Sequence, residues 1–220
     1  MSASVADDGS ESGGPLRVNI ALLANGGTEY LNKPGTARRA SAGIEVLVPL
    51  KHITFERAVA TCAEKKHAAF LGSASCLIVT NNSTALEESQ ALYARFGDLA
   101  RLFPRVSDLR LQAYANGVDI EAFLAEVNKL HALTRLEFRA WSNATKESKA
   151  SNLQMLAAFV QTRHRDPTKA SISHLTVIPG LVPLRDPKNE ELFDRFVATL
   201  GDAGCSVHEH TPGHTAKQFR

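Results

Sequence analysis

The sequence has few cysteines and no long apolar run, and each shortage excludes a class of protein. Cys62, Cys76 and Cys205 are an odd number, and each lies in or beside an apolar segment. They predict reduced core thiols in a cytoplasmic or nuclear protein, not a disulfide framework. No apolar run approaches the roughly 20 residues that cross a bilayer, so no membrane partner is expected. The N-terminus lacks a basic start followed by an apolar stretch, so no secretory signal is expected.

The sequence also lacks a large excess of one charge and a recognisable catalytic motif. With 25 basic and 23 acidic residues, the net charge is +2, so nucleic acid is not an expected partner. No Gly-x-Ser-x-Gly elbow appears, and no catalytic residue or cofactor is predicted. "LLANGGTEY" has Gly26 and Gly27 after a strand-like run, but it lacks the third glycine and the Lys-Ser/Thr ending of a phosphate loop. It predicts a turn.

Two short polar patterns have a structural interpretation that is simpler than a functional one. "HEHTPGH" contains His208, His210 and His214, but no nearby cysteine or aspartate completes a metal site. We expect a flexible tail there, without a metal. "ARRAS" places Ser41 after two arginines, which resembles sites of basic-directed kinases, and a phosphate there would mainly add charge to a loop. The sequence leaves any role of these residues open.

The chain divides into a tail, one domain and a short C-terminus. Residues 1–16 are rich in Ser, Gly and Asp and predict a disordered tail. With 220 residues, of which 44% are hydrophobic, the chain can bury one sizeable core. We therefore expect a single repeat-like α/β domain over residues 17–211 and a flexible C-terminus over residues 212–220.

Short β-like runs alternate with amphipathic segments of helical period from residue 43 onward. Leu153, Leu156, Ala157 and Val160 follow the spacing of three or four that a one-faced helix requires. Asp119 precedes another apolar face and is a candidate N-cap. Frequent alternation of strand and helix predicts an α/β arrangement with parallel neighbouring strands.

The stretch "LTRLEFRAW" (residues 133–141) is one copy of a repeated unit. Relative to Leu136, apolar residues lie six and three positions before it and two after it. The same offsets fit fully around Leu109 and Leu77, and in part around Leu175. The reference leucines follow one another at irregular intervals of 27 to 39 residues, each filled by a helix-like stretch.

This pattern, apolar-x-x-apolar-x-x-Leu-x-apolar followed by a helix, resembles the leucine-rich repeat of the helix-bearing, ribonuclease-inhibitor-like and F-box-associated kind. The resemblance covers about residues 71–177, and in weaker form it extends back to "IEVLVPL" and forward to "CSVHEH". It implies a leucine-rich-repeat-like α/β solenoid with a parallel sheet on one face and helices on the other. It also implies protein binding, in an adaptor that reads substrates for a ubiquitin ligase. No F-box module precedes the repeats, and the asparagine that commonly follows the strand occurs only as Asn82.

Alternation along the strands predicts which side chains are buried and which face a partner. Leu109, Leu111, Leu136 and Phe138 should point inward. The outward set is Cys76, Ile78, Thr80, Asp108, Arg110, Gln112, Arg135, Glu137, Arg139, His174, Thr176 and Ile178. The candidate partner-binding residues are Arg110, Gln112, Tyr114, Arg135, Glu137, Arg139, Trp141, His174 and Thr176, because arginine and aromatic residues are favoured anchors.

A second interpretation of the outward set involves no partner. Opposite charges, Asp108 with Arg135 and Arg110 with Glu137, would pair on a solvated sheet surface. Tyr114 would then close the edge of the core, together with Trp141.

Two functions from different classes follow from these patterns. The first is a non-enzymatic protein recognition module. The alternative is a compact, doubly wound α/β enzyme with its site at the carboxyl ends of the strands. The enzyme predicts helices on both faces of the sheet and a cleft holding Asn82, Asn116 or Trp141. The repeat register and the missing catalytic constellation favour the first. The partner, the oligomeric state and whether the chain is part of a longer array stay open.

Overall fold

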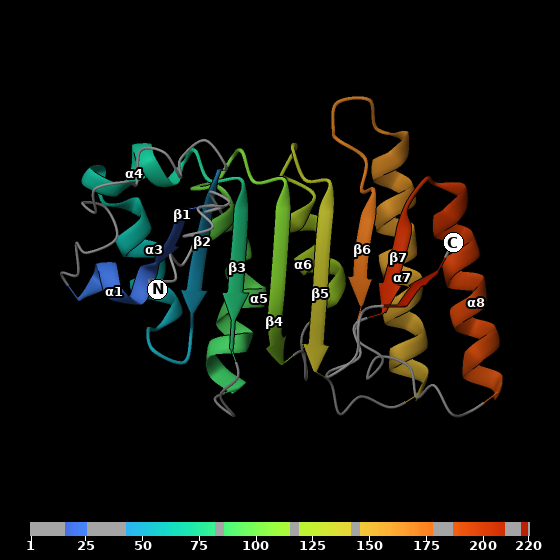
Figure 1. The fold of residues 1–220 in the computed structure, drawn as a ribbon. Helices are drawn as coiled ribbons and strands as arrows, with labels where there is room; N and C mark the ends of the chain where they lie inside the picture. The colour runs from blue at the N-terminus through green and yellow to red at the C-terminus, as the bar shows by residue number, and fades with distance from the viewer. Residues whose placement is uncertain are drawn as a thin grey trace, which may run out of the picture.

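Eight strands form one sheet, and their order across the sheet is their order along the chain (Figure 1). The computed structural model describes residues 16–25, 43–81, 86–114, 119–141, 146–177, 187–209 and 217–219. The strands are β1 (Leu16–Asn19), β2 (Ile44–Pro49), β3 (Cys76–Thr80), β4 (Asp108–Tyr114), β5 (Arg135–Trp141), β6 (His174–Val177), β7 (Ser206–Glu209) and β8 (Lys217–Phe219). Strands β1 to β7 run parallel, and β8 pairs antiparallel with β7.

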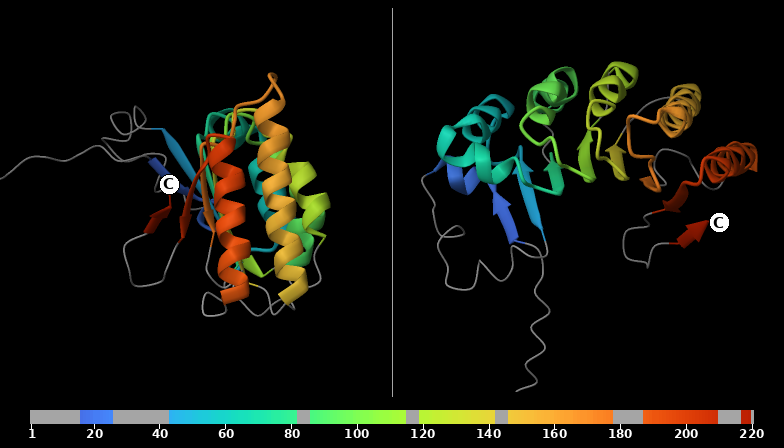
Figure 2. Two further views of the ribbon diagram at one scale, coloured as in Figure 1. Left: turned by 90° about the vertical axis from the view of Figure 1, so that its right-hand side faces the viewer. Right: turned by 90° about the horizontal axis from the view of Figure 1, so that it is seen from above.

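The helices that connect these strands lie along one face of the sheet. They are α3 (Phe55–Ala63), α4 (Lys65–Leu71), α5 (Leu86–Ala100), α6 (Ile120–Val127), α7 (Lys146–Arg165) and α8 (Pro187–Asp202), and a short helix α1 (Ile20–Ala24) follows β1. Seen from above, α3 to α8 form the outer side of an arc and the strands form its inner side (Figure 2). The predicted α/β class with a parallel sheet is confirmed. In the part of the chain that the structure describes, no helix is long and apolar enough to cross a membrane.

The doubly wound arrangement is not the one observed. It requires a reversal in strand order and helices on both sheet faces. The sheet instead runs in sequence from β1 to β8, and α3 to α8 share one face (Figure 2). Doubly wound enzymes usually bind their ligands in a crevice at the point where the strand order reverses. No such reversal occurs among the described strands.

The reference leucines of the repeat lie side by side in the sheet. Leu77 of β3 pairs in register with Leu109 of β4, which pairs with Leu136 of β5, and Leu136 pairs with Leu175 of β6. All four side chains are fully buried. Laying the sequence copies on one another thus predicted the register of four strands, because each inward leucine occupies the same layer of the shared core.

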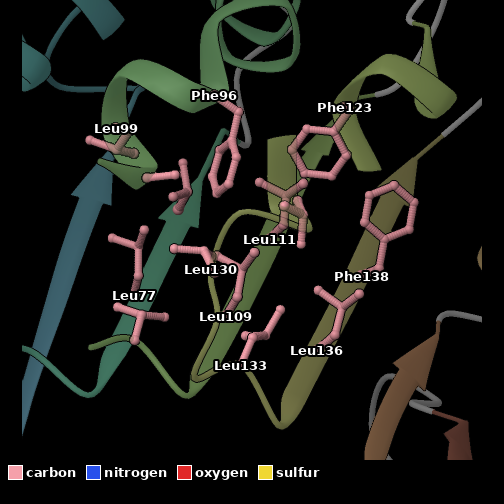
Figure 3. Close-up of a cluster of buried hydrophobic side chains, with 14 of the residues drawn as sticks. Leu77, Phe96, Leu99, Leu109, Leu111, Phe123, Leu130, Leu133, Leu136 and Phe138 are labelled. Carbon is pink, nitrogen blue, oxygen red and sulfur yellow. The ribbon is translucent and has the colours of Figure 1, made fainter. Parts of the chain in front are cut away.

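Aromatic side chains of the helices fill the space above these leucines. Phe123 of α6 lies between Phe96 of α5 and Phe138 of β5, with ring centroids 5.1 and 6.0 Å away (Figure 3). Leu111 and Phe138 are buried as predicted. The helices therefore pack on the sheet through the inward face that the alternation identified.

Local capping confirms some sequence predictions and corrects others. Asp119 caps α6, since its carboxylate accepts a hydrogen bond from the Ala122 amide at 2.9 Å. The strand-like interpretation of residues 20–24 is wrong, because the Asn19 side chain accepts from the Ala21 amide and starts α1. The segment from α3 to α4 is two helices, since Glu64 has the extended ψ of 130°. At the termini, β1 begins at Leu16, within the expected tail, and β8 lies within the expected flexible C-terminus.

A hydroxyl residue precedes each strand from β3 to β6 and links it to the strand before it. Ser107 Oγ donates to the carbonyl of Ser75 (3.3 Å), Thr134 Oγ1 to that of Ser107 (3.2 Å), and Ser173 Oγ to that of Thr134 (3.2 Å). The series begins with Ser75 donating to Ile44 at 3.4 Å, and Ser206 extends it by donating to Ser173 at 3.0 Å. We call this series the hydroxyl ladder. It ties successive repeats together at the amino ends of the strands.

Replacing Thr134 by valine removes one link of the hydroxyl ladder and keeps the side-chain shape. We expect the free energy of unfolding to fall by about 1 kcal/mol, because the Ser107 carbonyl loses one of its donors. Urea denaturation followed by circular dichroism measures this change. Thr162→Val, at an exposed position of α7, is the control and should change stability by less than about 0.5 kcal/mol. Equal stability of both variants would show that the link is dispensable.

Arg163 of α7 is a fully buried arginine that bonds to main-chain carbonyls and to no carboxylate among the described residues. Its guanidinium donates to the carbonyl oxygens of Leu130 (2.6 Å), Ala170 (2.7 Å), His131 (3.0 Å), Leu133 (3.2 Å) and Asn128 (3.4 Å). Burial lowers the pKa of Arg163, and Asp166 acts in the opposite direction. This one side chain therefore supplies hydrogen-bond donors to the carbonyl groups of the turn between α6 and β5, and it ties α7 to that turn.

Candidate functional site on the uncovered sheet face

The sheet face opposite α3 to α8 presents two rows of side chains that cross the strands, and we call it the uncovered face. The first row is Arg17, Glu45, Cys76, Asp108, Arg135, His174 and Ser206. The second row is Asn19, Leu47, Ile78, Arg110, Glu137, Thr176 and His208. The structure thus brings most of the predicted partner-binding residues onto one surface.

Some predicted residues lie at the limit of what the structure describes. Tyr114 and Trp141 are the last residues of β4 and β5 and pair in register. Their side chains, and that of Arg139, lie outside the described part. So do Ser41, Asn82, Asn116, Ile178, His210 and His214 as whole residues.

Cys76 lies in the outward register but is buried between its neighbours Glu45 and Asp108. Burial raises the pKa of its thiol to about 12, and the negative charge of Asp108 adds to the rise. Burial likewise raises the pKa of Cys62 to about 12 and that of Cys205 to about 11. All three cysteines are free and buried, which confirms the predicted core thiols for Cys62 and Cys205, whereas Cys76 lies on the opposite face of the sheet, and none is activated as a nucleophile.

The charges of the uncovered face pair differently from the sequence prediction. Arg110 Nη2 lies 2.8 Å from Asp108 Oδ2, and its Nε lies 3.3 Å from both carboxylate oxygens. The hydrogen bond with Asp108 raises the pKa of Arg110. The predicted pair between Asp108 and Arg135 is wrong, because Arg110, two positions along the same strand and on the same face, occupies the carboxylate.

Arg135 is left as an exposed cation at the centre of the uncovered face. In the described ranges it makes no hydrogen bond or ion pair, whereas Arg17 is paired with Glu45 at 2.9 Å. Glu137, in the second row, accepts a hydrogen bond from Gln112 Nε2 at 3.4 Å. Arg135 is therefore available to a group from outside the chain.

Two histidines stack beside Arg135. The rings of His174 and His208 are nearly parallel, with centroids 6.0 Å apart and an angle of 13° between planes. His208 lies in β7, so the expectation of a flexible tail from this residue onward is wrong. Its strand pairs in parallel with β6, within the domain expected over residues 17–211.

The hydroxyl ladder determines which imidazole nitrogens are protonated. Ser173 Oγ lies 2.8 Å from His174 Nδ1, and Ser206 Oγ lies 3.3 Å from His208 Nε2. Each serine can form both contacts as hydrogen bonds only if its hydroxyl donates to the ladder carbonyl and the imidazole donates to the hydroxyl. We assign these tautomers from the hydrogen-bond network. His174 Nε2 and His208 Nδ1 are then left as proton acceptors.

This arrangement suits binding better than covalent catalysis. A nucleophilic serine needs an imidazole that accepts its proton, and here a backbone carbonyl lies within hydrogen-bonding distance of each hydroxyl and competes for that proton. The described residues contain no group of three side chains that could hold a metal ion. Burial lowers the pKa of His174, and the charges of Arg135 and His208 lower it further.

On the helical side, a small hollow of about 150 Å³ lies between α7 and α8 and is lined mainly by apolar atoms. Leu153, Leu192 and Phe196 contribute to its wall. Its volume is below the roughly 300 Å³ of the smallest usual ligand pockets, so it is a packing gap between two helices.

No protein-family model, curated protein or solved structure matches the chain.

Proposed function

We propose that this chain is a non-enzymatic recognition module, built as a leucine-rich-repeat-like solenoid, that binds another protein through its uncovered face. One observation carries the proposal. Strands in sequential order, with helices α3 to α8 on the opposite side, leave the inner side of an arc without a covering helix among the described elements (Figure 2). Repeat proteins use such inner surfaces for binding.

The rigidity of the face supports this proposal. Beneath it, the side chains of Leu109, Leu136 and Phe138 are fully buried. At its edge, the hydroxyl ladder links the repeats. Side chains held on a packed sheet lose little conformational freedom on binding, which favours affinity.

The chemistry of the face also supports it. The described candidates Arg110, Gln112, Arg135, Glu137, His174 and Thr176 offer charges and hydrogen-bonding groups, and all are exposed or half-buried. Arginine is a favoured anchor of protein interfaces. The roles of Tyr114, Arg139 and Trp141 stay predictions. A place in a ubiquitin-ligase adaptor rests on the repeat resemblance alone and also stays a prediction.

The proposal is tested by affinity capture with a variant of the face. Arg135→Glu with Thr176→Arg changes two side chains of the face while leaving the paired Arg110 in place. We expect it to bind captured partners at least about tenfold more weakly, since charge reversal at an interface typically costs more than 1.4 kcal/mol. Partners must be identified with the unaltered chain and their affinities then measured with purified components.

Arg105→Glu is the matched control for this experiment. Arg105 is exposed in the turn before β4 and makes no ion pair among the residues described. This control should bind the same partners with unchanged affinity. Partners retained by the face variant, or lost equally from both proteins, would contradict binding through the uncovered face. Circular dichroism must first show that both variants are folded.

A further inference from the structure

In the half of the uncovered face nearer to β7, the first row carries the cation of Arg135 and no carboxylate among the described side chains, and the second row carries Glu137. Arg135 is exposed and unpaired among the described residues, and it neighbours His174 across the strands. The carboxylates nearby are engaged: Asp108 with Arg110, and Glu137 with the Gln112 amide. Burial lowers the pKa of His174, and the positive charge of the neighbouring Arg135 lowers it further.

We propose that Arg135, His174 and His208 bind an acidic segment of the partner protein, and that proton uptake by His174 tightens this binding as the pH falls. The inference rests on the proposed function, which it deepens by naming the chemistry of the partner.

Charge complementarity supports an acidic occupant. A guanidinium donates two parallel hydrogen bonds to one carboxylate, and Arg135 has no partner in the described ranges that competes for it. The side chains around it are the half-buried His174, Thr176 and Glu137. Glu137 opposes an anion and sits in the second row, so the first row is where a carboxylate would lie.

The hydroxyl ladder orients the imidazoles for this role. In the assigned tautomers, Ser173 and Ser206 accept the N–H groups of His174 Nδ1 and His208 Nε2. The nitrogens left over are proton acceptors, and each becomes a charged donor once it gains a proton. A carboxylate near Arg135 would then receive charge-assisted hydrogen bonds from the histidines as well.

The sign of the pH dependence follows from the groups that face His174. Burial lowers its pKa in the free protein, Arg135 and His208 lower it further, and Asp108 acts in the opposite direction. Ser173 contributes a neutral hydroxyl. A partner carboxylate adds negative charge and raises the pKa of the imidazole in the complex. The complex therefore binds more protons than the free protein, and affinity rises as pH falls until the carboxylates themselves protonate near pH ~4.

Fluorescence anisotropy with a labelled Asp/Glu-rich peptide tests this inference on the full chain. We expect the dissociation constant to fall about fivefold or more between about pH 7.5 and about pH 5.5. Arg135→Glu should abolish binding at both pH values. His174→Gln with His208→Gln should show the same affinity at both pH values, whereas Arg105→Glu should behave like the unaltered chain.

Three results would overturn the inference. The first is equal affinity for a control peptide in which Asn and Gln replace Asp and Glu. The second is a pH response that survives in the variant with both His174→Gln and His208→Gln. The third is tighter binding of an RNA oligonucleotide than of the acidic peptide. The proposed function fails separately, when captured partners are insensitive to Arg135→Glu with Thr176→Arg. Partners lost from that variant, together with no binding of the acidic peptide, would leave the recognition module standing and refute its acidic ligand.

Discussion

Replacing Arg163 by methionine should lower the free energy of unfolding by about 3–5 kcal/mol, the largest effect expected of any side chain outside the apolar core. Methionine fills much of the same space but donates no hydrogen bond. The carbonyls of Leu133 and Ala170 would then lose the donor that the guanidinium provides, whereas the Leu130 carbonyl would keep the Leu133 amide as a donor. Each unsatisfied buried group costs about 1–3 kcal/mol, partly offset by the removal of a buried charge.

The measurement is urea denaturation of Arg163→Met beside Arg165→Met. Arg165 lies two residues further along α7 and is exposed, so its loss should cost less than about 1 kcal/mol. Arg163→Lys should also destabilise the protein, because an ammonium has three donors and cannot reach five carbonyl oxygens. Similar midpoints for the two methionine variants would refute the role assigned to Arg163.

Leu136→Asp should leave no folded protein in the absence of denaturant. Leu136 is fully buried between Leu109 and Leu175 in the shared core, where an unpaired carboxylate costs several kcal/mol or forces its own protonation. A loss of this size is comparable with the whole stability of a domain, which is about 5–15 kcal/mol. Near-ultraviolet circular dichroism and a thermal melt report the outcome.

Two further variants keep this prediction informative. Leu136→Ala should fold with a stability loss of about 2–5 kcal/mol, as expected for a large-to-small change in a core. Arg135→Ala, one residue earlier on the opposite face of β5, should change stability by less than about 1 kcal/mol. A thermal melt in which Leu136→Asp is as stable as Arg135→Ala would contradict the strand register.

The layered core was predictable from sequence because it repeats. Apolar offsets around Leu77, Leu109, Leu136 and Leu175 placed four strands in register, and the structure has this register. A second repeated signal was overlooked: a serine or threonine lies two positions before each of these leucines. Its hydroxyl builds the ladder between strands, and this signal was readable at the same time as the leucines.

The charge arrangement of the site could not be predicted in the same way. Strand register places Asp108 beside Arg135. The Asp108 carboxylate nevertheless forms its ion pair with Arg110 of the same strand, because the long arginine side chain extends back to it. Arg163 gave no signal either, since an arginine at a helix end is usually exposed. Its burial follows from tertiary packing of α7 against the turn after α6. His208 became part of the site only through the pairing of β6 with β7.

The central claim is that partners bind the uncovered face, and site-specific photocrosslinking tests it most directly. A photoreactive side chain placed at Thr176, on the uncovered face, should crosslink a captured partner. The same group at Ala125, exposed on α6 on the helical side, should not. Crosslinks from Thr176 alone would support the recognition module. Crosslinks from Ala125 alone would contradict it and move the binding site to the helices.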